Sequence, residues 1–312
     1  MTSIRTSVFL LLITAILLVS PVSASLKISG TVKYMATVAP GIEVTFPITL
    51  SLSDTDPAGD YGLEVFGFEN DRRGGYVAVD AASDTGEQSA RPYLSLDKYV
   101  IHIEPGTNDV VTATLRVPPT AKGGMYALIN IHPSQVASGK GASVTTAINV
   151  PVMVTVSGTE SKETGVIDSI TIDSKKSPVI VTTQFTNTGN HHYYGVKNAV
   201  EVTNGNGMLV GSYESDPLVT AIVPGGTVSF VQPLNLTNVR DTYTVYTVRS
   251  YVIKGDDDVL DSNTNQFTTT EKNVYGAAVP LTYPAQTPTV ETPGFGWLLA
   301  CIGIICIALR KL

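Results

Sequence analysis

The chain has 312 residues, 27 of them acidic and 20 basic, so its formal net charge is −7. This balance argues against nucleic acid as a partner, because phosphate binding needs a basic surface. The two cysteines, Cys301 and Cys306, lie near the C-terminal end. The rest of the chain can therefore form no disulfide, no cysteine nucleophile and no cysteine metal site. Its length suits two domains of common size.

The first residues have the features of an export signal. Arg5 precedes an apolar run from Val8 to Val19, and Val22-Ser23-Ala24 then places small residues where a signal peptidase cuts. This pattern predicts a secretory signal peptide over residues 1–24, cleaved between Ala24 and Ser25. An uncleaved membrane anchor is the alternative, although the apolar core is short for a spanning helix.

Residues 25–157 alternate between short β-type runs and turn residues. The predicted strands are Leu26–Val38, Ile42–Leu52, Tyr61–Phe68, Lys98–Ile103, Asp109–Val117, Gly124–Ile131 and Ser143–Val156. Pro151 predicts that the last of these lies at a sheet edge or begins there, because proline cannot donate to a ladder. A single sheet would expose an apolar face to water, so we expect an antiparallel sandwich.

A polar linker, Ser157 to Gly165, leads to a second predicted domain over residues 166–270. Its predicted strands are Val166–Asp173, Val179–Asn187, Ala199–Thr203, Met208–Ser215, Thr227–Gln232, Asp241–Lys254 and Val259–Phe267. Asn204-Gly205-Asn206-Gly207 is a hairpin signal, since these residues accept positive φ. The expected fold class is therefore all-β, with two tandem immunoglobulin-like antiparallel β-sandwiches.

The last part of the chain predicts a stalk and a membrane segment. Residues 271–293 contain four prolines and no periodicity, which is typical of a stalk. Residues 294–312 hold an apolar run from Phe295 to Leu309 followed by Arg310 and Lys311. A helix of that run would rise roughly 22 Å, less than the ~30 Å hydrocarbon core. It is either an ordinary single-span anchor or a temporary sorting helix.

The tail also carries a motif. Pro293-Gly294-Phe295, a short apolar segment and terminal basic residues resemble the PGF-CTERM tail of archaeal surface proteins. The resemblance implies that an archaeosortase removes the helix and that a membrane lipid is attached to the new C-terminus. It also implies an archaeal envelope protein at the cell membrane, on the extracellular face.

A second resemblance covers the ectodomain. Its landmarks are Pro40-Gly41, Tyr61, Glu104-Pro105-Gly106, Pro118 to Tyr126, Phe185 to Asn190 and Val223 to Gly226. They resemble those of the two-domain ectodomain of WxL-interacting surface proteins and of other immunoglobulin-like surface modules. That family implies adhesive domains, one for cell wall and one for host matrix. The tail departs from the family's long helix, and peptidoglycan is not expected on an archaeal cell, so the ligand stays open.

The sequence predicts no cofactor and no metal site, with calcium at two acidic loops as the alternative. They contain Asp54, Asp56 and Asp60, and Asp256 and Asp258. Calcium takes six to eight oxygen ligands, but neither loop has the EF-hand order. A charged hairpin tip is the simpler interpretation of the second loop.

Other polar residues are interpreted structurally. His191 and His192 follow a turn without a third ligand at metal-binding spacing, so we interpret them as turn-flanking residues on an exposed strand. Asn235-Leu236-Thr237 is a glycosylation sequon with Asn235 as acceptor. The sequence has no nucleophile elbow, zinc-protease pair or phosphate-binding loop, so we predict that the protein is not an enzyme.

These features predict a membrane- or lipid-anchored surface protein that binds an envelope protein or a polysaccharide. Its archaeosortase contact would be transient. The alternatives are a structural, lattice-associated envelope protein without a discrete ligand, and an accessory subunit of a membrane complex.

Overall fold

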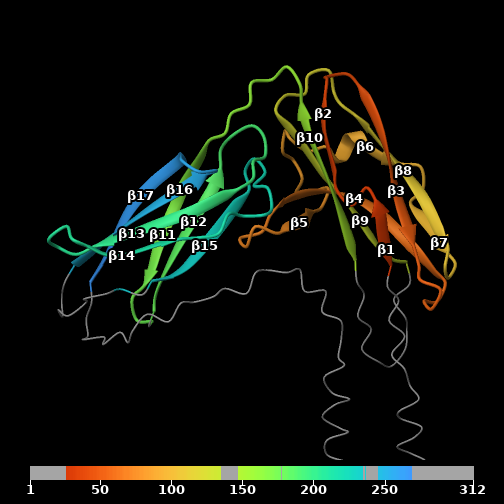
Figure 1. Cartoon of the computed structure of the whole chain (residues 1–312). Helices are drawn as coiled ribbons and strands as arrows, with labels where there is room; N and C mark the ends of the chain where they lie inside the picture. The colour runs from red at the N-terminus through yellow and green to blue at the C-terminus, as the bar shows by residue number, and fades with distance from the viewer. Residues whose placement is uncertain (1–25, 135–146, 177, 235, 237–244, 269–312) are drawn as a thin grey trace, which may run out of the picture. The chain divides into compact units, whose positions relative to one another are not determined.

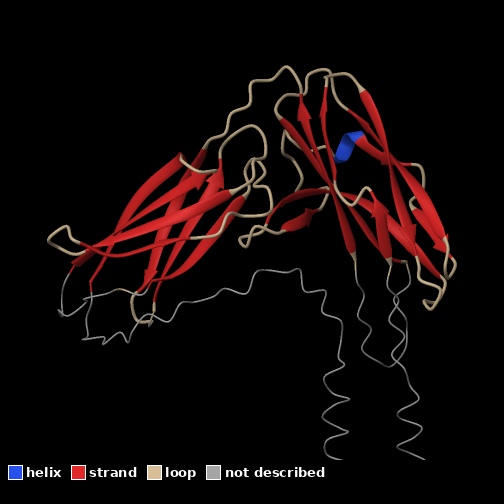
Figure 2. Cartoon of the chain, viewed as in Figure 1, coloured by secondary structure: helices blue, strands red, loops and turns tan. Residues whose placement is uncertain are grey.

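The computed structural model of the protein describes residues 26–134, 147–176, 178–234, 236 and 245–268 (Figure 1). All of them belong to one compact unit, residues 1–275. Strands account for nearly all of their regular structure, apart from the 3₁₀ helix η1, Arg91–Tyr93 (Figure 2). Among these described residues, none forms a helix with the length and hydropathy that crossing a membrane requires. The predicted signal peptide, stalk and tail lie outside them.

The first sandwich consists of two sheets that pack face to face. One has the strand order β1-β3-β8-β6, and the other has the order β2-β10-β9-β4-β5, with β7 also pairing with β4. The bounds are β1 Lys27–Gly30, β2 Tyr34–Val38, β3 Glu43–Ser51, β4 Gly59–Asn70, β5 Tyr76–Val79, β6 Leu94–Leu96, β7 Val100–Ile103, β8 Asn108–Arg116, β9 Gly124–Pro133 and β10 Ile148–Val156. The core between the sheets is apolar, with Ile48, Ile103, Leu115 and Ile129 fully buried.

The N-terminal segment differs from the single strand predicted over Leu26–Val38. Gly30 has φ +77°, and the chain crosses there from one sheet to the other. β1 pairs antiparallel with β3, whereas β2 pairs parallel with β10. The fully antiparallel pairing expected for this domain is therefore wrong at one strand pair. A positive φ is accessible to glycine without steric cost, which explains how one apolar run serves two sheets.

The prediction from Pro151 is also corrected. β10 lies between β9 and β2, so it is an inner strand rather than an edge. Pro151 pairs with Leu128 of β9, but the pairing with β2 begins only at Val152. Pro151 thus lies where β10 already pairs with β9 but does not yet pair with β2. Its missing N–H therefore costs no hydrogen bond to β2.

The strands β5 and β6 were not predicted. β5 has no buried residue and β6 has only three residues. A periodicity argument needs a longer run with one apolar face, so neither segment offers the signal.

The second sandwich has the sheets β11-β12-β15 and β14-β13-β16-β17. Each of its seven predicted strands has a counterpart in the structure. The bounds are β11 Gly165–Asp173, β12 Val179–Asn187, β13 Val196–Thr203, β14 Leu209–Glu214, β15 Thr227–Leu234, β16 Val245–Lys254 and β17 Asp258–Thr268. Three strands facing four in this order form an immunoglobulin-like sandwich, which confirms the predicted fold class.

Side chains of β17 close one open edge of this sandwich. The backbone N–H of Ile167 on β11 donates to Oδ2 of Asp261 at 2.7 Å, and Asn265 Nδ2 donates to the carbonyl of Ile170 at 2.6 Å. These contacts satisfy edge groups of β11 that would otherwise be available to another chain. They also assign Asp261, which lies near the second acidic loop, to a structural contact.

The core of the second sandwich contains a buried polar network between its sheets. Thr183 Oγ1 and Ser250 Oγ are 2.9 Å apart, and Asn198 Nδ2 donates to Ser250 Oγ at 2.7 Å. Gln232 Nε2 donates to Asn198 Oδ1 at 2.8 Å. All four residues are at most 1 % exposed. Such bonds join β12, β13, β15 and β16 in a chain whose predicted ectodomain has no disulfide.

Candidate functional site

The first acidic loop does not form a shared site. Asp56 is buried, and its carboxylate accepts the backbone N–H of Ser53 at 3.1 Å, as in a tight turn. Asp54 lies beside Gly106, where an added Cβ would be 2.0 Å from Asp54 Oδ1. Asp60 is the second residue of β4, so its predicted place in the loop is wrong. The three carboxylates therefore have separate surroundings.

Asp60 instead contacts a histidine on the neighbouring strand. His102 Nδ1 is 2.7 Å from Asp60 Oδ1, and His102 Nε2 is 3.2 Å from Glu104 Oε1. The hydrogen bond to Asp60 has the larger effect and raises the pKa of His102 above its ordinary value. The hydrogen bond to Glu104 raises this pKa further. Because the two carboxylates bind opposite ring nitrogens, they do not converge with the ring on one ion. All three side chains are exposed.

The second acidic loop is a charged hairpin tip, which is the simpler of the two interpretations from the sequence. Asp256 lies in the turn after Gly255, Asp258 is the first residue of β17, and both are exposed. Within the described ranges, no three His, Cys, Asp or Glu side chains gather so that they could hold a metal ion. The described residues therefore do not bring three carboxylates together at either candidate loop.

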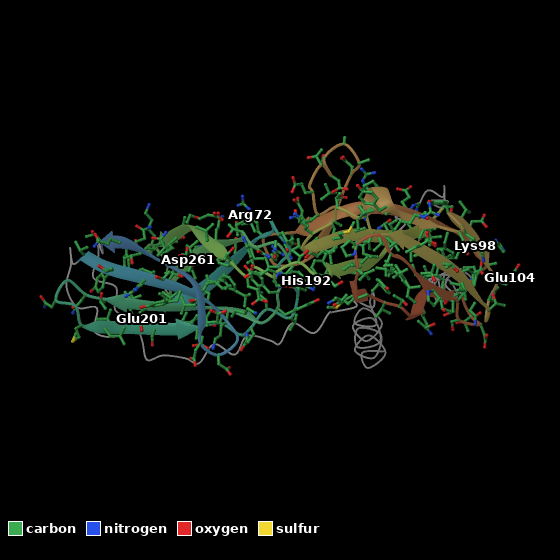
Figure 3. The ribbon with its side chains drawn as sticks, turned by 90° about the horizontal axis from the view of Figure 1, so that it is seen from above. Arg72, Lys98, Glu104, His192, Glu201 and Asp261 are labelled. Atoms are coloured by element: carbon green, nitrogen blue, oxygen red, sulfur yellow. The ribbon has the colours of Figure 1, made fainter. Side chains whose placement is uncertain are left out.

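The interpretation of the two adjacent histidines is wrong. His191 and His192 are only 8 % and 9 % exposed, so they do not lie on an exposed strand. His192, which is labelled in Figure 3, packs against Tyr126 of β9 in the first sandwich, with ring centroids 5.6 Å apart. Burial follows from this contact with a residue 66 positions away, which the local turn pattern cannot reveal.

The contact belongs to a cluster that we call the joint. It consists of apolar residues from both sandwiches, together with the polar residues Asn70 and His192 that contact them. The buried apolar members are Phe68, Tyr126, Leu128, Met153, Ala221 and Val223, and partly buried Phe66, Tyr76 and Tyr194 pack against them. Burial of this kind removes apolar surface from water on both sides, so it stabilises the contact between the sandwiches.

Asn70, the last residue of β4, binds the second sandwich through its side-chain amide. Its Nδ2 donates to the carbonyl of Ala221 at 2.8 Å, and its Oδ1 accepts the N–H of Val223 at 2.8 Å. The hydroxyl of Tyr76 accepts the N–H of Ala221 at 2.9 Å. The side-chain amide of Asn70 thus satisfies one backbone carbonyl and one backbone N–H of the loop before β15.

Backbone contacts reinforce the joint at two further points. The N–H of Gly124 donates to the carbonyl of Asn190 at 2.7 Å, and the N–H of Ser229 on β15 donates to the carbonyl of Arg72 at 2.7 Å. Gly123, with φ +72°, leaves no room for a Cβ, which would be 2.2 Å from the Asn190 carbonyl oxygen. The two sandwiches are therefore joined by specific contacts in addition to their linker.

A second surface feature lies on the outer face of β14-β13-β16-β17. Tyr251 contacts both Glu201 and Arg249 there: the Tyr251 hydroxyl donates to Glu201 Oε2 at 3.2 Å, and the Arg249 guanidinium carbon lies 4.8 Å from the Tyr251 ring centroid. Glu201 and Arg249 are exposed and paired in register across β13 and β16. We call this group, with the neighbouring Thr247 and Gln266, the charged aromatic face.

The outer face of the opposite sheet is different. Its polar positions are Ser169, Thr171, Thr182, Gln184, Thr186 and Ser229. Thr186 Oγ1 lies 2.7 Å from Thr227 Oγ1, so these two hydroxyls bind one another. β-branched side chains are favoured on a pleated surface, which accounts for this composition without a ligand.

Several predicted site residues lie outside the described part of the chain. They are the cleavage residues Ala24 and Ser25, the sequon residue Asn235 and the sorting motif Pro293, Gly294 and Phe295. Sequence reasoning missed the joint residues Asn70, Tyr126 and His192, and it missed the charged aromatic face. The tight Gly123-Gly124 and Asn187 to Asn190 turns, noted only as landmarks, were the available signal for the joint.

No family model matches the sequence, and no curated protein matches it. Solved structures do align over most of the chain. A chain from the chaperone–tip adhesin complex of CFA/I fimbriae is 13% identical with a TM-score of 0.40, covering 79% of this chain and 99% of that one. The Pseudomonas aeruginosa CupB2 chaperone is 14% identical with a TM-score of 0.32, covering 78% and 100%. The E. coli chaperone DraB is 11% identical with a TM-score of 0.34, covering 80% and 98%. At these values no functional argument follows from the likeness.

Proposed function

We propose that the chain is a binding protein of the cell surface, held on the extracellular face of the membrane by its C-terminal segment. The signal-peptide pattern of residues 1–24 supports export. The apolar run from Phe295 to Leu309 and the Pro293-Gly294-Phe295 motif support anchoring, either by the helix itself or by a lipid that replaces it. The two sandwiches are the part that meets the partner.

The charged aromatic face is the observation that carries this proposal. It combines an aromatic ring with a guanidinium group and a carboxylate that both contact the tyrosine, next to the hydroxyl of Thr247 and the amide of Gln266, which are 3.2 Å apart. Tyrosine and arginine are enriched where proteins bind partners, because they offer a large contact area with directed hydrogen bonds. The strands of the sandwich hold these groups in fixed register.

The chemistry of this face suits a neutral polysaccharide of the envelope. Sugar rings present hydroxyls to donors and acceptors and apolar C–H faces to an aromatic ring. Glu201 and Arg249 balance each other in charge, so the face has no excess charge to attract an ion. The acidic chain, with formal charge −7, would oppose an anionic polymer.

The joint favours a second candidate, a structural envelope protein without a discrete ligand. Specific contacts between the sandwiches set their mutual orientation, which a lattice component also needs. Neither candidate uses catalysis, and we propose that the protein is not an enzyme. Cross-linking separates the two, because a lattice protein would link mainly to itself.

The test is binding of the full chain, in detergent micelles, to polysaccharide isolated from the envelope. We expect Tyr251→Ala and Arg249→Ala each to weaken binding at least about tenfold, equivalent to roughly 1.4 kcal/mol. Thr182→Ala, on the opposite outer face, is the matched control and should bind like wild type. Equal binding by all four proteins would reject the assigned face, and absence of binding by wild type would reject the ligand class.

A further inference from the structure

His192 lies in the joint with its ring enclosed by other rings. Tyr126 and Tyr194 each approach it edge-on, with centroids 5.6 Å away, and His191 lies at 6.4 Å. The backbone N–H of His192 donates to the Tyr126 hydroxyl at 2.7 Å, and His192 Nδ1 is 3.1 Å from the same oxygen. The Tyr126 hydroxyl oxygen already accepts one N–H, so its own proton is free to be donated to a neutral Nδ1.

This arrangement fits the neutral imidazole and not the imidazolium. A protonated Nδ1 would become a donor, and the Tyr126 O–H would lose the acceptor it faces. Tyr126 is 3 % exposed, so water does not readily replace that acceptor. Burial lowers the pKa of His192 to about 4, with further lowering by His191 and by the Lys33 ammonium.

The charged groups around His192 offer no compensation. Lys33, from the turn between β1 and β2, binds the Tyr194 hydroxyl and lies 4.5 Å from the Tyr194 ring centroid. Glu163, from the linker, contacts His191 Nε2 at 3.2 Å and also pairs with Lys254. In the described part of the chain, that carboxylate is directed to His191 and not to His192. Tyr76 and Tyr126, from β5 and β9, face the ring region as neutral phenols with raised pKa values.

We propose that the joint is acid-sensitive: protonation of His192 loosens the contact between the two sandwiches and lets them reorient. The contact is stable while His192 is neutral, and it weakens as the pH falls below the pKa of the histidine in the opened protein. Acidification of the cell's surroundings would thereby change how the outer faces of the two domains are presented. This inference does not depend on the proposed ligand.

The size of the effect follows from linkage. With a pKa of about 4 in the closed joint and an ordinary value of about 6.5 once opened, the closed-to-open ratio should fall about 25-fold between pH 7.5 and pH 5. The sign is fixed because the closed state has the lower pKa and so binds fewer protons. Burial also lowers the pKa of His191, but its ring contacts Glu163 of the linker, so we do not expect opening of the joint to release it.

The test is amide hydrogen exchange on the full chain in detergent micelles, which detects opening even when the open state is rare. The reporters are the N–H groups of His192, Ala221 and Val223, which donate across the joint. Amides of β12 in the second sandwich serve as the internal reference. After correction for intrinsic rates, we expect reporter protection in wild type to fall about 25-fold from pH 7.5 to pH 5, while the β12 amides stay better protected than the reporters at both pH values.

Two variants make the result specific. His192→Asn places an oxygen acceptor near the position of Nδ1 without a titrating group, so its reporter protection should change less than about twofold over the same range. His132→Asn, on the same strand as Tyr126 but paired with Glu64, should behave like wild type. The proposal is overturned if wild-type protection does not fall, if protection in His192→Asn falls equally, or if the reporters at pH 5 are as well protected as the β12 reference.

Discussion

Replacing Asn70 by alanine tests the joint at its most specific contact. The Asn70 side chain is 7 % exposed, and it satisfies the carbonyl of Ala221 and the N–H of Val223 at 2.8 Å each. Alanine removes both bonds but leaves the two backbone groups in place. Because those groups are covered by Phe68 and other joint residues, they cannot recover full hydration without opening the joint.

The expected cost follows from these two orphaned groups. A buried donor or acceptor left without a partner costs about 1–3 kcal/mol. Partial opening of the loop before β15 will relieve some of this penalty, so we expect a loss of about 3 kcal/mol for Asn70→Ala. Glu69→Ala, one residue earlier and exposed on the same strand, is the matched control and should change stability by less than about 0.5 kcal/mol.

The measurement is urea unfolding followed by far-ultraviolet circular dichroism, together with exchange of the Val223 amide. Two domains need not unfold in one step, so the two transitions are fitted separately. We expect Val223 to lose protection in Asn70→Ala while amides in the core of each sandwich keep it. A variant within about 0.5 kcal/mol of wild type, with Val223 still protected, would refute the assigned role of the amide.

Three further changes test other parts of the structure. Ile129→Asp should unfold the first sandwich, because Ile129 is fully buried and an unpaired carboxylate there costs several kcal/mol; a folded variant by circular dichroism would show the assignment of the inner face to be wrong. Gly226→Ala should weaken the joint, since the new Cβ would be 2.3 Å from Asn70 Oδ1; unchanged exchange of the joint amides would contradict this. Cysteines at Thr183 and Ser250, whose hydroxyls are 2.9 Å apart, should form a disulfide worth up to about 4 kcal/mol in a chain with Cys301 and Cys306 replaced by serine; thermal melting with and without reductant measures it, and equal midpoints would oppose it.

Local sequence patterns were sufficient for most strands. The alternation of Val111, Ala113 and Leu115 with polar residues describes β8 directly, since one face of a strand packs on the core. The turn residues Asn204 to Gly207 correctly separate β13 from β14. These features depend on neighbours in sequence, so periodicity and turn chemistry reveal them.

The joint could not be predicted in the same way. His192 is buried because Tyr126, far away in sequence, covers it, and Asn70 is satisfied by a loop 151 to 153 residues away. Nothing in the residues next to either position signals these partners. The division of the N-terminal run into β1 and β2 likewise depends on which strands lie beside it, and Gly30 was the only local sign.

The same distinction applies to the charged aromatic face. Glu201, Arg249 and Tyr251 come from two strands that are separated by about fifty residues, and the ladder between β13 and β16 brings them together. A sequence pattern shows that each is on the polar side of its strand, but it does not show the register that makes them neighbours.

Photo-cross-linking from Thr247, two residues before Arg249 on the charged aromatic face, would decide between binding and structural assembly on intact cells. A photoreactive residue at this position should attach the protein to glycan-containing envelope material, and Arg249→Ala in the same chain should abolish the product. Products that contain only further copies of this chain, or a yield that Arg249→Ala leaves unchanged, would contradict the proposal that this face recognises a polysaccharide.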